Sequence, residues 1–586
     1  MKRARLWSYR SVDPAVERAL ATGLSLSPLA ARVLALRGVT SADHGRSFLD
    51  ASLQGLTAPS ELPQMAQAVE RLVRALAAGE KILVFGDSDV DGLSGSCLLG
   101  RMLAALGGDV AVHVPERTTD GYGLSAGGVA AVHRHQPRVL VTVDHGVTAF
   151  AAVGELMRGG IDVIVTDHHQ KPAELPPALA VVNPLLLDPS HAAAKLSGAG
   201  VAFKLACGIF ETLPPAKKQT PALRQVLREG LALAAMGTVA DVVALVGENR
   251  LLVRHGLKQL ESTSLPGLRA LRRAAGLDGR ALEAEDVSFG LAPRLNAAGR
   301  LGRVDVARRL LMTGDDGEAR RLADELESMN QQRRTIEGRV FELARQRLAE
   351  WPKDAPVVVL SDEGFHAGVI GIVAAKLVGL TGKPVLLIST AGAVARGSGR
   401  SVPGFDLARA LSRAGDLVLS CGGHAAAAGL EMEPARVDAL ARRLAENAAQ
   451  DFRDPAPPTL QIDSEVLLHE MHPRLLDELR RREDRLRMAL APRPEATQPV
   501  FAASDVELAA PPRRVGKDGG HLQLRLKNGA KSLPAIAFGF GAQAESVANG
   551  RLSLAFTPRP STYAGPAVVE LVVADLKSTS AAEAAT

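Results

Sequence analysis

The stretch that decides the fold is ILVFGDSDVDG, from Ile82 to Gly92. It opens with a short apolar run, and four to eight apolar residues that end at a turn signal are typical of a buried β-strand. Asp87, Asp89 and Asp91 follow at every second position, and a helix-like sequence begins after them. Neighbouring carboxylates repel one another, so either the loop is solvated or a hard divalent cation offsets the repulsion. This stretch alone leaves both interpretations open.

Bulk properties indicate a globular protein with several domains. At roughly 150 residues per domain, a chain of 586 residues predicts about three to four of them. Hydrophobic residues make up 46% and charged residues 23%, as in ordinary soluble proteins, and the absence of any run of eighteen apolar residues predicts no transmembrane helix. The N-terminal segment carries two early positive charges without the apolar core of a secretory signal.

Charge and cysteine content narrow the functional classes. Lys and Arg outnumber Asp and Glu by 69 to 64, a mild excess that permits a polyanionic partner without requiring one. Cys97, Cys207 and Cys421 are scattered without CxxC spacing. That distribution argues against a zinc site or a disulfide framework. We therefore expect a protein of the reducing cytoplasm.

Strand-like and helix-like segments alternate between residues 65 and 260. Near-continuous Val, Ile and Leu runs separated by helical segments predict an α/β fold with a doubly wound parallel sheet, covered on both faces. The expected strands are KILVF (81–85), DVAVHV (109–114), RVLVTVD (138–144), IDVIVTD (161–167) and LAVVNP (179–184). An amphipathic helix is expected before them, over residues 65–79.

Changes in composition predict the domain boundaries. The expected parts are an N-terminal lead-in (1–50), the α/β domain (51–260), a helical connector that includes a long helix from Asp315 to Glu350 (261–352), a smaller α/β domain (353–452), a domain with about five strand-like runs (453–578) and a disordered tail (579–586). Five antiparallel strands in such a short segment favour an OB-fold-like β-barrel, a common nucleic-acid binder.

Three of the predicted strands end in aspartate: Asp87, Asp144 and Asp167. The carboxyl ends of parallel strands lie along one edge of the sheet, where ligands bind. Three strands that end in aspartate at one edge therefore favour a metal site over a solvated loop. His168 and His169 follow directly, and successive side chains of extended backbone point to opposite faces. One imidazole can then bind a cation while its neighbour faces a substrate.

Asp241 lies within an otherwise apolar run, from Leu231 to Val246. A carboxylate in such surroundings is costly unless it is paired or bound to a metal, although an Asp that caps a helix at a turn is an alternative. An oxygen-rich set with one histidine suits two Mn²⁺ or Mg²⁺ ions better than Zn²⁺. Two such ions, about 3.5–4 Å apart, activate water and stabilise a leaving oxygen. The predicted chemistry is hydrolysis of a phosphodiester or phosphoanhydride.

Candidate phosphate contacts share glycine-flanked segments, which we expect to be loops whose backbone amides can approach an anion. They are Arg117 in PERTTDGYG, Arg294 and Arg300 in PRLNAAGR, and Arg400 and Ser401 in GSGRS. The run GGHAAAAG places His424 ahead of an expected helix of small residues, a second place for an anion. Any one of these arginines is more often a surface ion pair, and their grouping favours phosphate recognition.

These motifs resemble a known family. GDSDVDG, TVDHG, VTDHHQ and TVADVV are similar to the four phosphoesterase motifs of the DHH superfamily, and GSGRS and GGHAAAAG resemble its DHHA1 domain. RTTDGYGLS, VNP and PRLNAAGR narrow the resemblance to the RecJ family of bacterial exonucleases. The resemblance extends from LWSYR at Leu6 to LVVADL at Leu571, in the domain order of that family.

The resemblance implies a role for each motif residue. The implied metal ligands are Asp89, Asp91, Asp144, His168 and Asp241, with Asp87 a ligand or a close partner. His169 would face the scissile phosphate. The implied substrate contacts are Arg117 and Arg300 at the 5′-phosphate, Asn296, and Arg400, Ser401 and His424 of the DHHA1 domain. A narrow groove between the two domains would exclude duplex DNA.

The activity implied by the resemblance is 5′→3′ exonuclease action on single-stranded DNA, by a two-metal mechanism with Mn²⁺ or Mg²⁺. It would release 5′-mononucleotides in DNA repair and recombination. Expected partners are single-strand-binding protein and a helicase, and the chain is expected to be a monomer. One alternative is a DHH phosphodiesterase for short oligonucleotides or cyclic dinucleotides, or a pyrophosphatase, although those relatives have only two compact domains. Another is an inactive DNA-binding scaffold, which would have lost the metal carboxylates.

The sequence departs from the family pattern at three places. Ser88 replaces the usual tyrosine, and His145 stands at a variable position, with neither expected to touch a ligand. LAPRPEATQPVF (490–501) replaces a Gly-rich stretch, which leaves open how the OB-like domain joins the chain.

Overall fold

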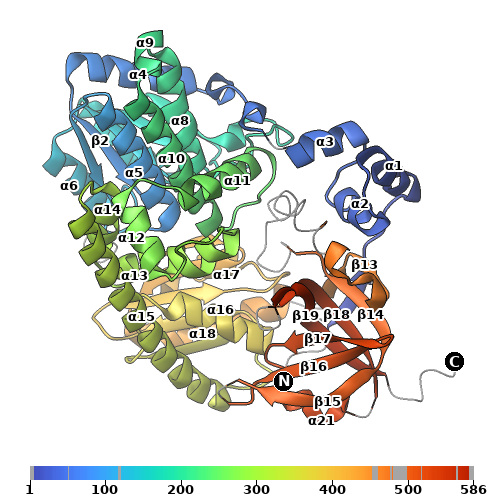
Figure 1. The fold of residues 1–586 in the computed structure, drawn as a ribbon. Coiled ribbons are helices and arrows are strands. Elements are labelled where there is room, and N and C mark those ends of the chain that lie inside the picture. The colour runs from blue at the N-terminus through green and yellow to red at the C-terminus, as the bar shows by residue number, and fades with distance from the viewer. Residues whose placement is uncertain are drawn as a thin grey trace. The chain divides into compact units, whose positions relative to one another are not determined.

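The computed structural model describes residues 5–50, 52–116, 120–451, 459–475, 478, 498–516, 518–548, 550–561 and 565–579 (Figure 1). The chain divides into two compact units, Tyr9–Glu327 with Gln461–Thr586, and Met1–Ser8 with Ser328–Leu460. Arg117, the predicted tail from residue 580 onward and most of LAPRPEATQPVF lie outside the described residues. No described helix is both long enough and apolar enough to cross a membrane.

The first unit contains the predicted parallel sheet. Its strands are β2 (Ile82–Gly86), β3 (Val110–His113), β4 (Val139–Val143), β5 (Asp162–Thr166) and β6 (Ala180–Val182). They pair in parallel in the order β3-β2-β4-β5-β6, so the predicted doubly wound sheet is confirmed. The chain steps to opposite sides of β2 to form β3 and β4. Ligands bind at the carboxyl ends of strands at such a switch in strand order.

Helices bury both faces of this sheet. They are α4 (Met65–Ala78), α5 (Val90–Ala105), α6 (Ala126–His135), α7 (Phe150–Arg158), α8 (Gly198–Thr212), α10 (Pro221–Ala240) and α11 (Gly247–Glu261). Leu83 and Leu140 of the sheet share one core with Val132 of α6 and Leu156 of α7. Each buried aliphatic side chain of this kind contributes about 1.5–3 kcal/mol. α5 and α8 cover the other face, while α10 packs against both of them and α11 packs against α10.

The connector is helical throughout its described elements: α12 (Pro266–Ala274), the π-helical η4 (Asp286–Leu291), α13 (Ala292–Arg300), α14 (Val304–Met312) and α15 (Asp316–Glu350). The predicted long helix is confirmed as α15. PRLNAAGR was predicted to be a loop, which is wrong, because it forms α13. Pro293 stands in the first turn, where its missing N–H costs nothing, and Leu295 and Ala298 are buried.

The second unit is built on a mixed sheet in the order β10-β11-β9-β8-β7. Its elements are β7 (Val358–Asp362), α16 (Ile370–Thr381), β8 (Val385–Ser389), β9 (Ala395–Arg400), α17 (Leu407–Ser412), β10 (Ser420–His424), β11 (Ala427–Met432) and α18 (Val437–Asp451). GSGRS was predicted as a loop, but its first four residues, Gly397–Arg400, lie on strand β9 and Ser401 directly follows it. A Cβ atom at Gly397 would lie 2.9 Å from Leu430, and one at Gly399 2.5 Å from Leu407, so these glycines allow close packing.

The helix predicted after His424 is also wrong. β10 and β11 form an antiparallel hairpin in which His424 pairs with Ala427 across a two-residue turn. Ala428, Leu430 and Met432 are each at most 5% exposed. They alternate with less buried residues, and a period of two favours a strand over a helix. The sequence interpretation missed this alternation because the run consists mostly of alanines.

The C-terminal sheet has seven strands in the order β13-β14-β18-β19-β17-β16-β15. They are β13 (Ser464–Glu465), β14 (Phe501–Val506), β15 (Leu508–Val515), β16 (His521–Asn528), β17 (Lys531–Ala537), β18 (Arg551–Ser561) and β19 (Gly565–Thr579). Among the described residues β13 and β15 are edge strands, each paired on one side only, so the sheet is OB-like but is not the closed barrel that was expected. Strand β15 was missed because of Pro511 and Pro512, which edge strands tolerate.

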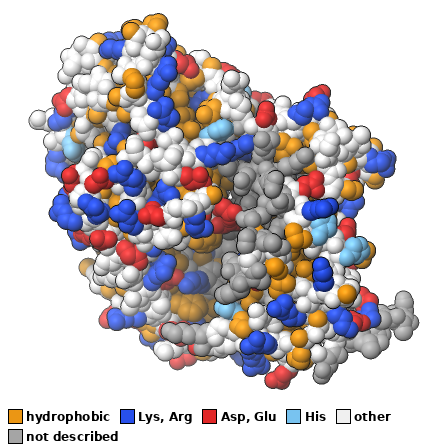
Figure 2. Space-filling view, viewed as in Figure 1, with side chains coloured by type: hydrophobic (Ala, Val, Ile, Leu, Met, Phe, Trp, Pro, Cys, Tyr) orange, Lys and Arg blue, Asp and Glu red, His pale blue; other side chains and the backbone are white. Residues whose placement is uncertain are grey.

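Strand β16 has the alternation that its sequence predicts. Leu522, Leu524 and Leu526 are fully buried, whereas Arg525 and Lys527 are exposed. Figure 2 shows Lys and Arg side chains interspersed with apolar ones over the C-terminal sheet, at the lower right. The outward side of this sheet is therefore basic.

The N-terminal helices α1 (Pro14–Leu24), α2 (Pro28–Ala35) and α3 (Ala42–Asp50) share a core with this C-terminal sheet. Leu20 and Leu34 are buried in one cluster with Phe501 and Phe556. An ion pair joins the same two segments, since Arg37 Nη1 lies 3.1 Å from Asp463 Oδ1. The two ends of the chain thus stabilise one another.

Candidate metal centre

The predicted carboxylates gather at the carboxyl edge of the parallel sheet. Asp87 follows β2, Asp144 follows β4, and His168 and His169 follow β5, while Asp241 ends helix α10. Asp87 is 3% exposed and Asp91 is fully buried, so the interpretation as a solvated acidic loop is wrong. Asp144 has a φ of 68°, a left-handed conformation that aspartate adopts more readily than most residues.

His168 lies at the middle of the cluster. Its Nε2 atom is 3.0 Å from Asp144 Oδ1, 3.5 Å from Asp241 Oδ2 and 3.9 Å from Asp91 Oδ2. Side chains from the first turn of α5, the loop after β4 and the end of α10 therefore converge on one imidazole nitrogen.

Three groups of side chains could each hold one cation, because their ligand atoms lie within 4.8 Å of one another. The groups are Asp87, Asp89 and Asp144; Asp91, His168 and Asp241; and Asp144, His168 and His169. Asp144 belongs to two of them. Buried Asp144 Oδ1 and His168 Nε2 have no hydrogen-bond partner of good geometry among the described residues. Unsatisfied atoms of this kind, in a carboxylate-rich set, fit hard divalent cations.

The pKa shifts of the clustered side chains also favour a bound divalent cation. Burial, followed by the charges of Asp91 and Asp89, raises the pKa of Asp144 well above its usual value. Burial and the charge of Asp91 also raise the pKa of Asp241 to about 8. Burial lowers the pKa of His168, which favours the neutral imidazole that binds metals. A divalent cation would relieve the mutual repulsion of these carboxylates.

His169 has a different side-chain partner from His168. Its Nδ1 atom lies 2.8 Å from Asp167 Oδ1, and this hydrogen bond raises the pKa of His169 to about 9. Burial opposes ionisation of Asp167, but hydrogen bonds from the His169 side chain and from backbone amides lower the pKa of Asp167 to about 2. The backbone amides of Val147, His168 and His169 all donate to this carboxylate. Asp167 therefore orients His169.

The carboxylates of the opening stretch are held in three different ways. Asp87 Oδ1 accepts a hydrogen bond from the Ser88 amide at 2.6 Å. Asp89 caps helix α5, since its Oδ1 accepts from the amides of Asp91 and Gly92 at 3.0 and 3.2 Å. Asp91 accepts hydrogen bonds from the backbone amides of Gly198 and Ala199 in helix α8. Asp241, for which helix capping was the alternative, follows the last residue of α10 and faces His168.

Helix α13 brings two substrate candidates to the metal loop. A Cβ atom at Gly299 would lie 3.0 Å from the carbonyl oxygen of Ser88, so α13 approaches the turn after β2. Asn296 is half-buried and Arg300 is exposed on this helix. Arg294 is engaged elsewhere, because its Nε atom lies 2.6 Å from Glu327 Oε2. For Arg294 the ion-pair alternative holds.

The candidates of the second unit lie together around the β10–β11 turn. Ala427 pairs with Arg400 on one side and with His424 on the other, and the Ser401 amide donates to Ala426 at 2.8 Å. The Arg400 guanidinium donates to the carbonyl of Gly399 at 2.8 Å. Arg400 and His424 thus lie on β9 and β10, the two strands that flank β11, and Ser401 directly follows β9.

Comparison with known proteins identifies the family. The sequence matches the DHH family N-terminal domain at residues 81–238, the DHHA1 domain at 354–450 and the RecJ OB domain at 489–575. It is 32% identical to the single-stranded-DNA-specific exonuclease RecJ of Bacillus subtilis, over 94% of this chain and 68% of that protein. It is 37% identical to RecJ of Thermus thermophilus, over 93% of this chain and 77% of that protein. This chain belongs to the RecJ family.

A solved structure of the RecJ family agrees with the fold. RecJ from Thermus thermophilus in complex with Mn²⁺ has a TM-score of 0.81 and 34% identity, covering 98% of this chain and 80% of that chain. The same relative in complex with Mg²⁺ has a TM-score of 0.76. The resemblance drawn from the motifs and the predicted fold class are confirmed.

Two residues near these carboxylates, exposed Tyr122 and buried His145, were not predicted to matter. Burial and the charges of Asp87 and Asp144 raise the pKa of Tyr122, which stands between Gly121 and Gly123, both at positive φ. The glycine pair in GYG was the signal for this turn. His145 Nε2 lies 3.0 Å from the carbonyl oxygen of Phe85, so His145 supports the turn that carries Asp144.

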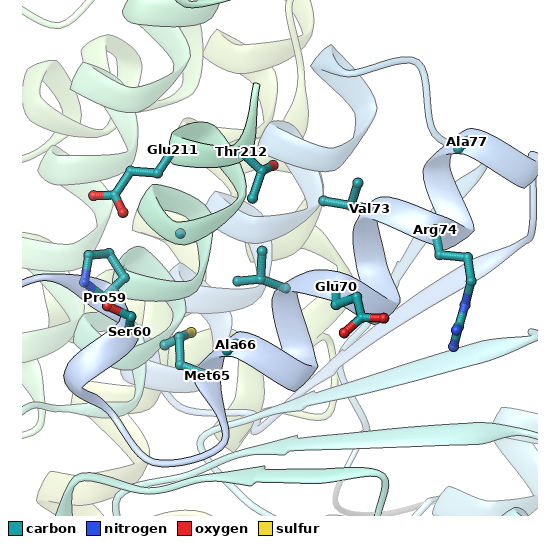
Figure 3. Close-up of a pocket in the computed structure, with 12 residues that line it drawn as sticks. Pro59, Ser60, Met65, Ala66, Glu70, Val73, Arg74, Ala77, Glu211 and Thr212 are labelled. Carbon is teal, nitrogen blue, oxygen red and sulfur yellow. The ribbon is translucent and has the colours of Figure 1, made fainter. Parts of the chain in front are cut away.

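An apolar groove of about 550 Å³ lies at the other end of α8 (Figure 3). Met65, Val69 and Val73 of α4 line it, and Glu211 and Thr212 of α8 stand at its rim. None of the candidate metal ligands lines this groove. It is separate from the metal centre.

Proposed function

We propose that this chain is a 5′→3′ exonuclease specific for single-stranded DNA, which hydrolyses phosphodiester bonds and releases 5′-mononucleotides in DNA repair and recombination. The observation that carries the proposal is the carboxylate cluster in which Asp144 belongs to two cation-binding groups. A carboxylate shared by two such groups suits a pair of neighbouring ions, which together activate a water and stabilise a leaving oxygen. Membership of the RecJ family supplies the substrate class.

The proposed metal ligands are Asp87, Asp89, Asp91, Asp144, His168 and Asp241, for two Mn²⁺ or Mg²⁺ ions. When bound, the ions would supply an activated water and would stabilise the leaving oxygen. His168 would bind through Nε2, the nitrogen nearest the three carboxylates. Asp144 would help to hold both ions, because it belongs to two of the possible groups.

His169 is proposed to act on the scissile phosphate. Asp167 holds a proton on Nδ1 of His169 and favours the charged imidazolium. A cationic donor beside a phosphodiester stabilises negative charge that develops on its oxygens. His169 is therefore expected to contact the phosphate rather than an ion.

Substrate binding is proposed for six residues: Arg117, Asn296, Arg300, Arg400, Ser401 and His424. Proximity of α13 to the Ser88 carbonyl supports Asn296 and Arg300 as contacts near the reacting phosphate. Arginines that bind the 5′-phosphate would explain a 5′→3′ polarity, because they would hold the strand by its 5′ end. The basic outer side of the C-terminal sheet is proposed to hold the DNA strand farther along.

Further proposals concern partners, location and domain limits. We expect single-strand-binding protein and a helicase as partners, a monomeric chain, and a cytoplasmic location that suits the free thiols of Cys97, Cys207 and Cys421. The predicted limits at residues 50, 260, 352, 452 and 578 are proposed as domain boundaries, which limited proteolysis with mass spectrometry would test.

Digestion of long single strands labelled at the 5′ or the 3′ end tests the activity. With Mn²⁺ or Mg²⁺ the 5′-label should appear at once as mononucleotide, while the 3′-labelled strand shortens progressively. EDTA should stop both, and duplex DNA should resist. Cleavage of dinucleotides alone would favour a short-oligonucleotide phosphodiesterase, and DNA binding without cleavage under every metal condition would favour an inactive scaffold.

A further inference from the structure

The first turn of helix α8 (Gly198–Thr212) touches one proposed metal ligand directly. The amide of Gly198 donates to Asp91 Oδ2 at 2.7 Å, and the amide of Ala199 donates to Asp91 Oδ1 at 3.0 Å. Asp91 is fully buried. Amides at a helix N-terminus have no partner within the helix and favour a carboxylate. Both oxygens of Asp91 are therefore fixed by a helix that is more than a hundred residues away in the sequence.

The same turn lies in close contact with a second proposed ligand, Asp144. A Cβ atom at Gly198 would lie 2.6 Å from Asp144 Cβ, 2.7 Å from its Oδ1 and 2.8 Å from its Cγ. Real Cβ atoms essentially never come within 3.0 Å of another heavy atom. Asp144 is 1% exposed, so its carboxylate has little room to retreat. Only glycine leaves Asp144 in its observed position.

A hydroxyl pair ties this turn to the helix that carries a third ligand. Thr238 Oγ1 donates to the carbonyl of Ala234 at 2.7 Å, so at 2.9 Å it accepts from Ser197 Oγ. Ser197 Oγ in turn accepts from the amide of Gly200 at 3.1 Å, which caps α8. Thr238 lies on α10, the helix that Asp241 ends. All of these groups are buried.

We propose that Ser197–Ala199 is the support that sets the spacing of Asp91, Asp144 and Asp241 for metal binding, with Gly198 as its main positioning residue. The inference rests on the proposed function, because it concerns the same metal centre. Groups that orient metal ligands contribute strongly to affinity, and their mutation typically weakens binding about 10–100-fold.

Gly198→Ala tests the proposal by Mn²⁺ titration calorimetry on the full chain. Gly200→Ala is the matched control: it adds the same methyl group to the same helix, where it would meet Leu196 and Leu252 side chains at 3.0–3.5 Å. We expect Gly198→Ala to weaken Mn²⁺ binding by about 10–100-fold. Gly200→Ala should bind Mn²⁺ as the unchanged protein does, and both variants should unfold at similar temperatures without metal.

A second pair keeps the test decisive if Gly198→Ala does not fold. Ser197→Ala removes the hydroxyl without adding atoms and should weaken Mn²⁺ binding, whereas Ser197→Thr keeps a hydroxyl and should restore it. Equal Mn²⁺ affinity in Ser197→Ala and Ser197→Thr, or in Gly198→Ala and Gly200→Ala, would overturn the inference. An unchanged protein that binds no Mn²⁺ would instead refute the proposed function.

Discussion

The Nε2 atom of His168 lies 3.0 Å from the Oδ1 atom of Asp144. Both atoms are buried, and neither makes a hydrogen bond of good geometry within the described structure. Burial keeps the imidazole neutral by lowering the pKa of His168, while burial and neighbouring charges raise the pKa of Asp144. A bound cation is expected to satisfy both atoms.

His168→Ala should abolish cleavage of single-stranded DNA while leaving DNA binding intact. The substitution removes the nitrogen on which three carboxylates converge, but it leaves the basic C-terminal sheet unchanged. Nuclease assays and fluorescence anisotropy on the same preparation measure the two properties. His133→Ala is the control, because that histidine is half-exposed on α6 and should keep full activity. Retained cleavage in His168→Ala would remove it from the ligand set.

His169→Ala should separate chemistry from metal binding. Because Asp167, rather than a cation, engages its Nδ1 atom, Mn²⁺ affinity should change little. The turnover rate should fall by about 10²–10³-fold, as for loss of a donor that stabilises developing negative charge, with KM nearly unchanged. Titration calorimetry and steady-state kinetics check both parts. A variant that loses Mn²⁺ affinity as strongly as His168→Ala would make His169 a ligand.

Mn²⁺ should stabilise the protein, and EDTA should reverse the effect. Binding to the folded state alone contributes about 2.7 kcal/mol when the free ion is at a hundred times its Kd. Asp144→Asn should remove this gain yet unfold at a higher temperature than the unchanged protein without metal, since it relieves repulsion among buried carboxylates. Thermal unfolding with and without Mn²⁺ measures both effects. A destabilised, metal-free Asp144→Asn would contradict the repulsion argument.

Leu34→Ala should destabilise the core shared by the two ends of the chain. Leu34 is fully buried in one cluster with Phe556, and a buried Leu→Ala change costs about 2–5 kcal/mol. Leu53→Ala, at a 39% exposed site, should change stability by less than about 0.5 kcal/mol. Urea unfolding of both variants checks this. If the two variants were equally stable, the N-terminal helices would not be part of that core.

Arg525→Ala should weaken binding to single-stranded DNA and make it less salt-dependent. Arg525 is exposed on β16, and for single strands each neutralised phosphate adds about 0.7 to the slope of log affinity against log salt. Removal of one such arginine should therefore lower the slope by that amount. The control is Arg551→Ala on the same sheet, because Arg551 already pairs with Asp505 and Glu507. Anisotropy titrations at several salt concentrations separate the two, and equal slopes in all three proteins would exclude Arg525 as a phosphate-binding residue.

Local patterns were sufficient for the parallel sheet and for bringing together most residues of the candidate metal centre. Strands such as Val139–Val143 are nearly continuous apolar runs, and three of the five strands are followed directly by an aspartate. The rule that parallel strands share a carboxyl edge then brings Asp87, Asp144 and His168 together without coordinates. The same reasoning failed for Arg294 and for the segment after His424, where short, small-residue sequences fit a loop, a helix or a strand equally well.

What the sequence determined by itself is therefore the order of elements and the edge at which the carboxylates meet, because periodicity and strand direction are local properties. Tertiary structure alone decided that Gly198 abuts Asp144, that the amides of α8 hold Asp91, and that the N-terminal helices share a core with the C-terminal sheet. Each of these contacts joins residues far apart along the chain. Such contacts follow from how packed elements fill space, and no spacing in the sequence encodes that.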